Sequence, residues 1–362
     1  MRLVTSSLLR GVGFCLALFL TARAQSTPEA IAKQPGFVKS EFIAQQPPTP
    51  MSHASTIVQS KDDLLCAWIG GSQERALDVS IWLSRNAGSG WTEPVEVANG
   101  VHDKERLRYP CWNPVLFRPR NGPLILFYKE GPSPAEWWGM VMTSDDNGQT
   151  WSRPKRLFNG IYGPVRNKPI ELTDGTILAG SSVESSGWLV HVERTKNVMR
   201  EWSKSIPLNS SLQWGAIQPT LLPWDETTIQ MLCRTKQGEI SQCWSYDRGY
   251  HWSAMRSTGL PNPNSAIDSV LLREGRAVLV YNHSDTDRGI LNVAASSDGR
   301  KWQAAFVLEN EPGAEFSYPA VIQTADRMVH ITYTWKKQGI RHVVLDPGEL
   351  QLQPILNGQW PK

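Results

Sequence analysis

The sequence predicts an all-β fold, a six-bladed β-propeller, because two repeats run along the chain in parallel. The first repeat is a set of tryptophans spaced 60, 51, 50 and 50 residues apart: Trp91, Trp151, Trp202, Trp252 and Trp302. The second is a set of β-type runs spaced 55, 50, 50 and 50 residues apart, which open at Pro114, Pro169, Pro219, Ser269 and Pro319. A fixed period of this size is typical of solenoids and propellers. Several short strands in each period, with no long helical pattern, favour the propeller.

Each tryptophan ends a short polar turn. The clearest copy, residues 144–151, reads SDDNGQTW, and residues 245–252 keep its Ser, Asp, Gly and Trp in register. The copy at 296–302 is one residue shorter, and the copies at 84–91 and 195–202 have Asn in place of Asp. Asp and Asn side chains hydrogen-bond to the backbone of such turns, and an indole packs well between strands. We therefore expect these turns to be structural and not catalytic.

The number of blades follows from the β-type runs. The run from Ala54 to Trp68 aligns as a further copy and makes six. Each repeat reads as two apolar strands around a polar turn, then a third strand, the Trp turn and a fourth strand. The sixth repeat ends three strands in, at IRHVVLD, so we expect residues 37–43 to supply its missing strand. An N-terminal strand that closes the last blade removes exposed sheet edges. We expect a single propeller domain over residues 37–362, preceded by a linker over 25–36.

The first 24 residues have the pattern of a secretory signal peptide. A basic start is followed by an apolar run, Gly11 to Leu20, and then by the small-residue cleavage pattern Ala22-Arg23-Ala24. An uncleaved anchor is the alternative. We therefore expect an exported protein, either periplasmic or extracellular, without a membrane contact after cleavage.

Removal of this segment leaves 34 basic residues (37 − 3) against 34 acidic ones. This balance gives no reason to expect a nucleic-acid partner. We expect a monomer without a cofactor, and the sequence holds no metal-binding motif. Cys233 and Cys243 flank a turn, so an exported chain could join them in a disulfide, although two buried thiols fit the spacing equally well.

Six polar residues directly precede the six predicted inner strands and should converge on the propeller axis: His53, Asn113, Lys168, Gln218, Asp268 and Tyr318. A concave surface with a few convergent polar groups is a typical binding site. A water-filled tunnel with a polar rim is the alternative. Loops expected on the same face add charged, aromatic and amide side chains: Glu74, Asp78, Trp112, Lys129, Trp138, Arg166, Arg234, Asn264 and Arg288. Tryptophan beside charged groups suits sugars, while ordinary core packing is the alternative for any single tryptophan.

With these motifs, the chain resembles the sialidase (neuraminidase) superfamily, whose Asp-boxes, or BNR repeats, match the Trp turns. The runs PCWNPVLF, GPSPAEWWGM, NPNSAID and SYPAVIQ are similar to bacterial proteins described as predicted neuraminidases. The resemblance implies a six-bladed propeller that cleaves terminal sialic acids. Enzymes of the superfamily use three arginines on the sugar carboxylate, a tyrosine nucleophile assisted by a glutamate, and an aspartate as acid and base.

The superfamily pattern carries over only in part. Tyr318 matches the nucleophile, and Arg234 and Arg288 match two of the arginines. His53-Ala54-Ser55-Thr56 stands where the first arginine is expected, and Ala216 stands in place of the glutamate. Asp78 or Glu74 could serve as the acid and base.

Three functions remain open. The first is an exo-glycosidase that acts on a terminal acidic sugar of a glycan. The second is a lyase that cleaves beside a uronic acid, for example of the rhamnose–glucuronate type, with His53 or Tyr318 as the base. The third is a propeller that binds glycans without catalysis. The candidate catalytic residues are Tyr318, His53, Asp78 and Asp268. The candidate substrate-binding residues are Arg234, Arg288, Lys168, Arg166, Asn113, Gln218, Trp112, Lys129, Trp138 and Asn264.

Overall fold

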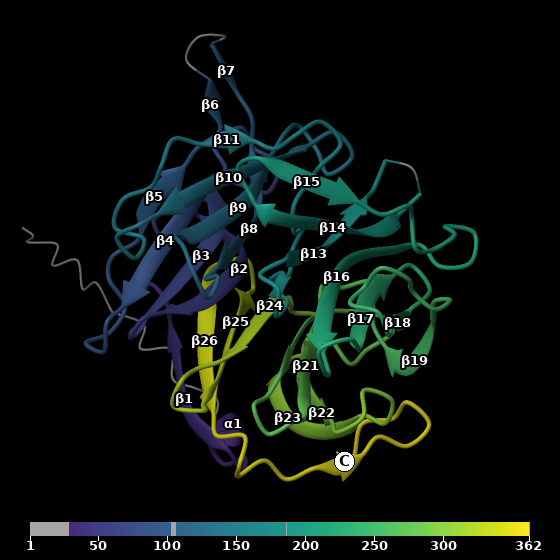
Figure 1. Ribbon diagram of the computed structural model, residues 1–362. Coiled ribbons are helices and arrows are strands. Elements are labelled where there is room, and N and C mark those ends of the chain that lie inside the picture. Colours follow the sequence, from purple (N-terminus) through teal and green to yellow (C-terminus); the bar gives the residue numbers. More distant parts are fainter. Residues whose placement is uncertain (1–28, 103–105, 186, 362) are drawn as a thin grey trace, which may run out of the picture.

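The computed structural model describes residues 29–102, 106–185 and 187–361, and these form a ring of six antiparallel sheets around a central axis (Figure 1). The prediction of an all-β, six-bladed propeller is confirmed. The predicted signal peptide lies outside the described residues.

Each blade runs from an inner strand at the axis to an outer strand at the rim. Blade one contains β2 (Met51–Ser60), β3 (Asp63–Gly71), β4 (Ser80–Asn86) and β5 (Val95–Ala98). Blade two contains β8 (Cys111–Phe117), β9 (Leu124–Glu130), β10 (Trp138–Ser144) and β11 (Lys155–Arg156). Blade three contains β12 (Ile170–Glu171), β13 (Ile177–Val183), β14 (Leu189–Asn197) and β15 (Glu201–Lys204). Blade four contains β16 (Ala216–Pro223), β17 (Ile229–Thr235), β18 (Glu239–Ser245) and β19 (Arg256–Pro261).

Blade five contains β20 (Asp268–Leu271), β21 (Ala277–Tyr281), β22 (Ile290–Ser296) and β23 (Gln303–Asn310), and β27 (Gln353–Pro354) joins it as an outermost strand. Blade six contains β24 (Phe316–Gln323), β25 (Val329–Trp335), β26 (Gly339–Leu345) and β1 (Phe37–Phe42). A two-stranded hairpin, β6 (Val101–His102) and β7 (Leu107–Arg108), projects from the rim beside blades one and two (Figure 1). The sequence did not reveal this hairpin or the fifth strand of blade five.

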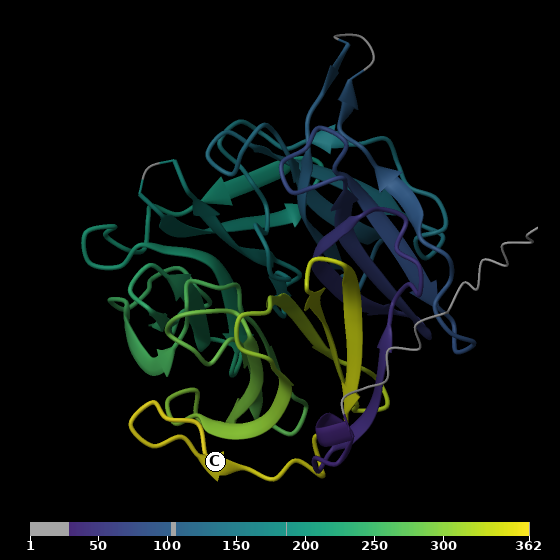
Figure 2. The ribbon, with the colours of Figure 1, turned by 180° about the vertical axis from the view of Figure 1, so that it is seen from behind.

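The N-terminal strand closes the ring, as predicted. β1 pairs antiparallel with β26, from Phe37 opposite Leu345 to Phe42 opposite Arg341. The segment before it is not a free linker. A short helix, α1 (Glu29–Ala32), packs beside the closing blade (Figure 2), where Ile31 is buried in the core of blades five and six. We expected a linker over 25–36, but its described part is anchored to the ring by this apolar side chain.

The hydrophobic core is divided among the gaps between neighbouring blades. Separate clusters of buried side chains join blades one and two, two and three, three and four, four and five, five and six, and six and one. Each sheet therefore buries both faces against its neighbours, and the ring has no free sheet face in its interior. This arrangement leaves the two ends of the axis as the places where polar side chains can gather.

The Trp turns are structural, as predicted. In the turn at 144–151, Asp146 Oδ1 accepts hydrogen bonds from the backbone N–H of Gln149 and Thr150 at 3.1 and 2.8 Å. Ser144 Oγ accepts a further one from the N–H of Gly148 at 2.7 Å. Trp151 packs against the core between blades one and two. The turns lie at the end of the axis where the inner strands end, which we name the turn face; the end where the inner strands begin is the mouth face.

All four cysteines in the described part of the chain are buried free thiols. Cys233 lies opposite Ser241, and Cys243 lies opposite Met231, so the two thiols do not face each other across the hairpin. The structure therefore favours free thiols over the disulfide that the spacing left open. Within the described ranges, the structure contains no helix of the length and apolar character needed to cross a membrane.

Candidate active site on the propeller axis

The inner strands of four blades carry the same bulge at the mouth face. One extra residue enters the inner strand between His53 and Thr56, between Trp112 and Val115, between Ile217 and Thr220, and between Ser317 and Ala320. The first residue of each bulge has left-handed backbone geometry: φ is 56° at Ala54, 41° at Asn113, 54° at Gln218 and 54° at Tyr318. Non-glycine residues rarely adopt such angles, and they often do so at functional sites. The bulge turns these residues out of the sheet pattern.

The bulges revise the predicted ring of equivalent residues. Ala54, and not His53, occupies the position of Tyr318 in blade one, so the sequence alignment was one residue off in that repeat. The cause is that Ser55 takes the bulge position that proline holds in the other three blades. Lys168 and Asp268 are not equivalent to Tyr318 at all. The inner strands of their blades, β12 and β20, pair with the second strands without a bulge.

Tyr318 lies at the centre of the candidate site, and three guanidinium groups surround its ring. Their Cζ atoms lie 5.4 Å (Arg166), 6.0 Å (Arg234) and 5.9 Å (Arg288) from the ring centroid. Arg234 Nη1 also donates a hydrogen bond to Tyr318 Oη at 3.3 Å. The prediction that Tyr318, Arg234 and Arg288 share one site agrees with this geometry.

Asn264 links the two mouth arginines. Arg234 Nε donates to Asn264 Oδ1 at 2.7 Å, and Arg288 Nη2 donates to the Asn264 carbonyl at 3.1 Å. Gln218 Oε1 accepts a second hydrogen bond from Arg234, at 3.2 Å. Asn264 therefore fixes the spacing of Arg234 and Arg288, while some of their N–H groups remain available for a ligand.

His53 packs directly on Tyr318, with 4.3 Å between the two ring centroids. The side chain is buried, and its Nδ1 atom has no hydrogen-bond partner among the described residues. Burial holds the pKa of His53 well below its ordinary value, and the charges of Lys337, Arg288 and other nearby cations lower it further. His53 is therefore a neutral imidazole at physiological pH.

Arg166, Lys168 and Asp268 form a charged layer beneath this site. Arg166 is buried and crosses the axis to donate hydrogen bonds to the carbonyl oxygens of Tyr318 and Pro319 at 2.6 and 2.7 Å. Lys168 Nζ, from the start of blade three, donates to Asp268 Oδ2 of blade five at 2.8 Å. Burial lowers the pKa of Arg166 to about 10, so the group stays charged at neutral pH. We predicted roles in substrate binding and catalysis for these residues, but the structure gives Arg166 a supporting position and places the Lys168–Asp268 pair deeper along the axis.

The other predicted residues are spread more widely. Trp112 is buried, and its Nε1 donates to the Gly131 carbonyl at 2.8 Å, which is ordinary core packing. Lys129 is also buried and donates to the Pro164 carbonyl at 2.8 Å. Trp138 packs edge-to-face on Tyr109, with ring centroids 5.0 Å apart. None of these three contacts connects a side chain to Tyr318, so the clustering of tryptophans in the sequence overstated the size of the site.

The remaining predicted acids and amides differ in environment. Asn113 is buried at the bulge of blade two, in the position that corresponds to Tyr318. Asp78 is exposed, and its two carboxylate oxygens accept hydrogen bonds from the N–H and Oγ of Ser72 at 3.0 and 2.9 Å. Glu74 accepts a hydrogen bond from Lys337 Nζ at 2.9 Å.

Two further carboxyl groups, neither of them among the candidate catalytic or substrate-binding residues, lie near this site. Glu315 accepts a hydrogen bond from Arg288 Nη1 at 3.2 Å and lies 3.6 Å from Lys337 Nζ. Glu184, on the loop after β13, has a pKa that burial raises, although the charges of Arg234 and Lys236 oppose this shift. Glu184 follows a second strand and Glu315 precedes an inner strand, so both lie on mouth-face segments. This position in the repeat is the sequence feature that could have indicated them.

The arrangement can bind an anion and protonate a leaving group. Arginines arranged around a tyrosine offer paired N–H donors of the kind that bind carboxylates. A carboxyl group with a raised pKa suits a general acid, and a neutral imidazole suits a base. Within the described ranges, no group of three or more His, Cys, Asp or Glu side chains is placed to hold a metal ion.

Comparison with known proteins agrees with this architecture. The protein-family model described as a BNR repeat-like domain matches residues 62–331. No curated protein sequence matches the chain.

Among solved structures, the NanB sialidase from Streptococcus pneumoniae is similar, with a TM-score of 0.70 and 11% identity over 86% of this chain and 71% of that one. A protein of unknown function from Dyadobacter fermentans has a TM-score of 0.71 and 15% identity over 88% of this chain and 100% of that one. The intramolecular trans-sialidase from Ruminococcus gnavus has a TM-score of 0.69 and 10% identity over 84% of this chain and 96% of that one. Identities this low show a shared fold, the six-bladed propeller of the sialidases. Because the family model covers most of the chain, the protein belongs to the family of BNR repeat-like domain proteins.

Proposed function

We propose that this protein is an exo-glycosidase that removes a terminal acidic sugar, sialic acid or a related sugar, from glycans. The observation that carries the proposal is the group of three guanidinium groups around Tyr318, two of which are held in register by Asn264. Such a group favours a carboxylated ligand beside a phenol. The solved R. gnavus trans-sialidase binds oseltamivir carboxylate, which supports an acidic ligand on this fold.

In the proposed reaction, Arg234 and Arg288 bind the sugar carboxylate and place the anomeric carbon over Tyr318 Oη. The phenol oxygen attacks this carbon and forms a glycosyl–tyrosine bond, while the glycosidic bond breaks. A phenol is a suitable nucleophile here, because the neighbouring sugar carboxylate would repel an anionic one. His53 takes the phenol proton; it lies against the Tyr318 ring and is neutral at physiological pH.

The leaving oxygen needs a proton, and Glu184 is the mouth-face carboxyl group best suited to supply it. Burial raises its pKa, and Arg234 is close enough to influence that pKa. In the second step, Glu184 takes a proton from water, the resulting hydroxide attacks the anomeric carbon, and Tyr318 leaves as a phenolate that regains its proton from His53. Asp78 and Glu74 remain the alternatives, although each already accepts hydrogen bonds from neighbouring groups.

The departures from the superfamily pattern set an expectation for affinity. His53 stands in place of one arginine, so one charge-assisted hydrogen bond to the carboxylate is missing, and such bonds contribute about 1.5–3 kcal/mol. Arg166 does not replace it, because its guanidinium already holds two backbone carbonyls. We therefore expect weaker binding of sialic acid than three available arginines would give.

A uronic-acid lyase is the second candidate, and the environment of His53 is the observation in its favour. A neutral imidazole beside cations can remove the proton next to a carboxylate, whose charge the arginines would neutralise. The sugar bond would then break by β-elimination without the addition of water.

The test is mass spectrometry of products from sialylated and uronate-capped glycans, with the full mature protein. A released acidic sugar that has gained water supports the hydrolase, and an unsaturated uronate shows the lyase instead. Y318F should abolish hydrolysis, whereas Y250F is the matched control because Tyr250 is exposed in a Trp turn on the opposite face. Binding without any product, with affinity lost in Y318F, would overturn catalysis and favour a glycan-binding propeller.

A further inference from the structure

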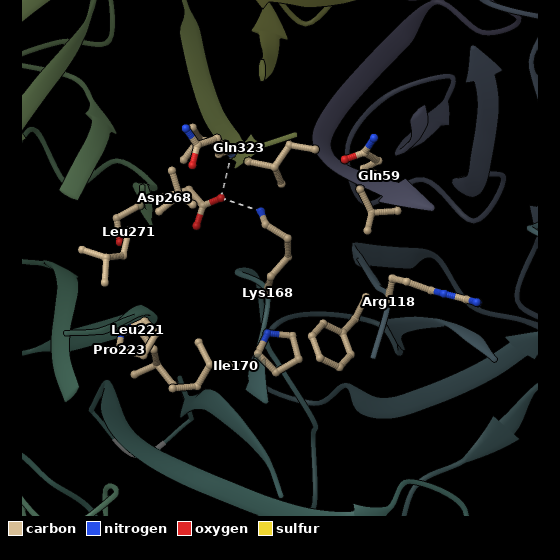
Figure 3. A pocket seen from close by; sticks show the side chains of 16 residues that line it. Gln59, Arg118, Lys168, Ile170, Leu221, Pro223, Asp268, Leu271 and Gln323 are labelled. Carbon is tan, nitrogen blue, oxygen red and sulfur yellow. Dashed lines mark hydrogen bonds and ion pairs between the residues drawn. The ribbon is translucent and has the colours of Figure 1, made fainter. Parts of the chain in front are cut away.

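A second cavity opens at the turn face of the axis, opposite Tyr318. Its volume is about 390 Å³, and all six blades contribute to its walls. One apolar residue from each blade illustrates the lining: Val58, Phe117, Ile170, Leu221, Leu271 and Ile322. Most of these lie near the ends of inner strands. Figure 3 shows the side chains arranged around an open centre.

The charged layer separates this cavity from the site at Tyr318. Lys168 and Asp268 line the cavity, and Figure 3 shows their ion pair among the lining side chains. Above them, Arg166 crosses the axis to the backbone of Tyr318 and Pro319. A ligand in the turn-face cavity would therefore contact Lys168 without reaching the Tyr318 ring.

The polar groups of the cavity offer donors more than acceptors. Asp268 already accepts hydrogen bonds from Lys168, from Thr220 Oγ1 at 3.1 Å and from the Val321 N–H at 2.9 Å. Among the described residues, Lys168 Nζ has Asp268 as its one hydrogen-bond acceptor, so two of its three N–H groups are open. Gln59 uses its carbonyl oxygen for the Ala325 N–H at 2.8 Å.

Gln323 is satisfied in a similar way. Its carbonyl oxygen accepts a hydrogen bond from the Arg273 N–H at 2.9 Å, and its amide donates to the Arg327 carbonyl. Arg118 adds a second cation at the rim. Arg166 lies in the charged layer behind the Lys168–Asp268 pair. The charged groups around the cavity are therefore three cations, Lys168, Arg118 and Arg166, and one anion, Asp268. Among the described residues, the acceptors of the lining side chains are therefore largely engaged, and the charges around the cavity are positive on balance.

We propose that the turn-face cavity binds a small organic anion with an apolar body, an aliphatic or aromatic monocarboxylate. The carboxylate would accept the open N–H groups of Lys168, and the apolar body would cover the walls that the inner strands provide. A largely apolar cavity of roughly 300–1,000 Å³ with a few placed polar groups is typical of small-molecule sites. This site is separate from the glycosidase site and does not depend on it.

Isothermal titration and ligand-observed NMR with hexanoate and benzoate test the proposal on the full mature protein. Hexanol and benzyl alcohol are the neutral controls. We expect the carboxylates to bind at least about tenfold more tightly than the alcohols, because only an anion gains from the ammonium group. K168Q should lose this preference, and Y318F should keep it.

Removal of Lys168 leaves Asp268 buried without its cation, so K168Q could fail to fold. L271W avoids this problem, because Leu271 is a half-buried wall residue and a larger ring would fill the cavity. We expect L271W to abolish hexanoate binding, whereas L212W, at a side chain that is 96% exposed elsewhere, should not. Unchanged binding in L271W, equal binding of alcohols, or no saturable binding of either carboxylate would each overturn the proposal.

Discussion

A buried histidine pair at the ring closure predicts that stability is lost in mild acid. His330, on β25, donates from Nδ1 to His342 Nε2 at 2.9 Å, and His342 Nδ1 then donates to Glu41 Oε1 at 3.0 Å. This assignment of donors is the one that satisfies all three side chains. This series of hydrogen bonds joins β25 and β26 to the N-terminal strand β1, so it lies where the last blade of the propeller is closed.

The expected magnitude follows from the pKa of His330. This pKa is lowered from 6.5 to about 4, chiefly by burial; the charges of His342 and Lys39 act in the same direction, while Asp326 and Glu41 oppose the shift. Since the folded-state pKa is the lower one, the unfolded chain binds more protons between pH 6.5 and about 4. The free energy of unfolding therefore falls as the pH falls through this window. A shift of this size corresponds to roughly 3 kcal/mol.

Urea unfolding, followed by tryptophan fluorescence at about pH 8 and about pH 4.5, measures this loss. H330Q keeps an amide donor for His342 but cannot titrate, so its loss on acidification should be smaller by about 2–3 kcal/mol. H251Q is the control, since the His251 side chain is 92% exposed in a Trp turn and should contribute little. An H330Q variant with the same loss as the wild type would refute the assignment of the acid sensitivity to this pair.

Three further predictions concern the axis and the thiols. R166M leaves the carbonyls of Tyr318 and Pro319 without their buried donor, so we expect a destabilisation of about 2–4 kcal/mol in urea unfolding. We also expect kcat to fall by a larger factor than KM changes. An unaffected kcat would contradict the positioning role of Arg166. N264A frees the guanidinium groups that Asn264 spaces, so KM for an acidic glycan should rise about tenfold, whereas a neutral aryl glycoside should show no such rise. Cys66, Cys111, Cys233 and Cys243 should all react with a thiol reagent after denaturation without a reductant, and a failure of Cys233 and Cys243 to react would show the disulfide instead.

Much of the fold was predictable because it depends on local repeats. In the turn at 144–151, Ser144 and Asp146 accept hydrogen bonds from backbone N–H groups of the turn, and this requirement is visible in a few adjacent letters. The closing strand was predictable for a different reason, since the sixth repeat lacked one strand and β1 was the unassigned segment. β27 and the β6–β7 hairpin belong to no repeat, so nothing periodic indicated them.

The site was predictable only to the level of residue positions. The spacing of the repeats located Tyr318, Gln218 and Asn113 at equivalent places, and the backbone angles agree. It could not show that Trp112 and Lys129 turn away into the interior, because a strand places alternate side chains on opposite faces and the bulge changes that alternation locally.

The difference between bulged and regular inner strands explains how one axis provides two separate environments. Where the strand carries a bulge, as at Tyr318, the residue reaches the mouth face and meets Arg234 from the end of β17 and Arg288 from the loop after β21. Where it does not, in blades three and five, Lys168 and Asp268 stay deeper and pair with each other at 2.8 Å. That pair, with Arg166, forms the charged layer between the two ends. A repeat fold places six equivalent positions around the axis. In blades three and five the inner strand lacks the bulge, so Lys168 and Asp268 stay deeper and close the Tyr318 site on one side.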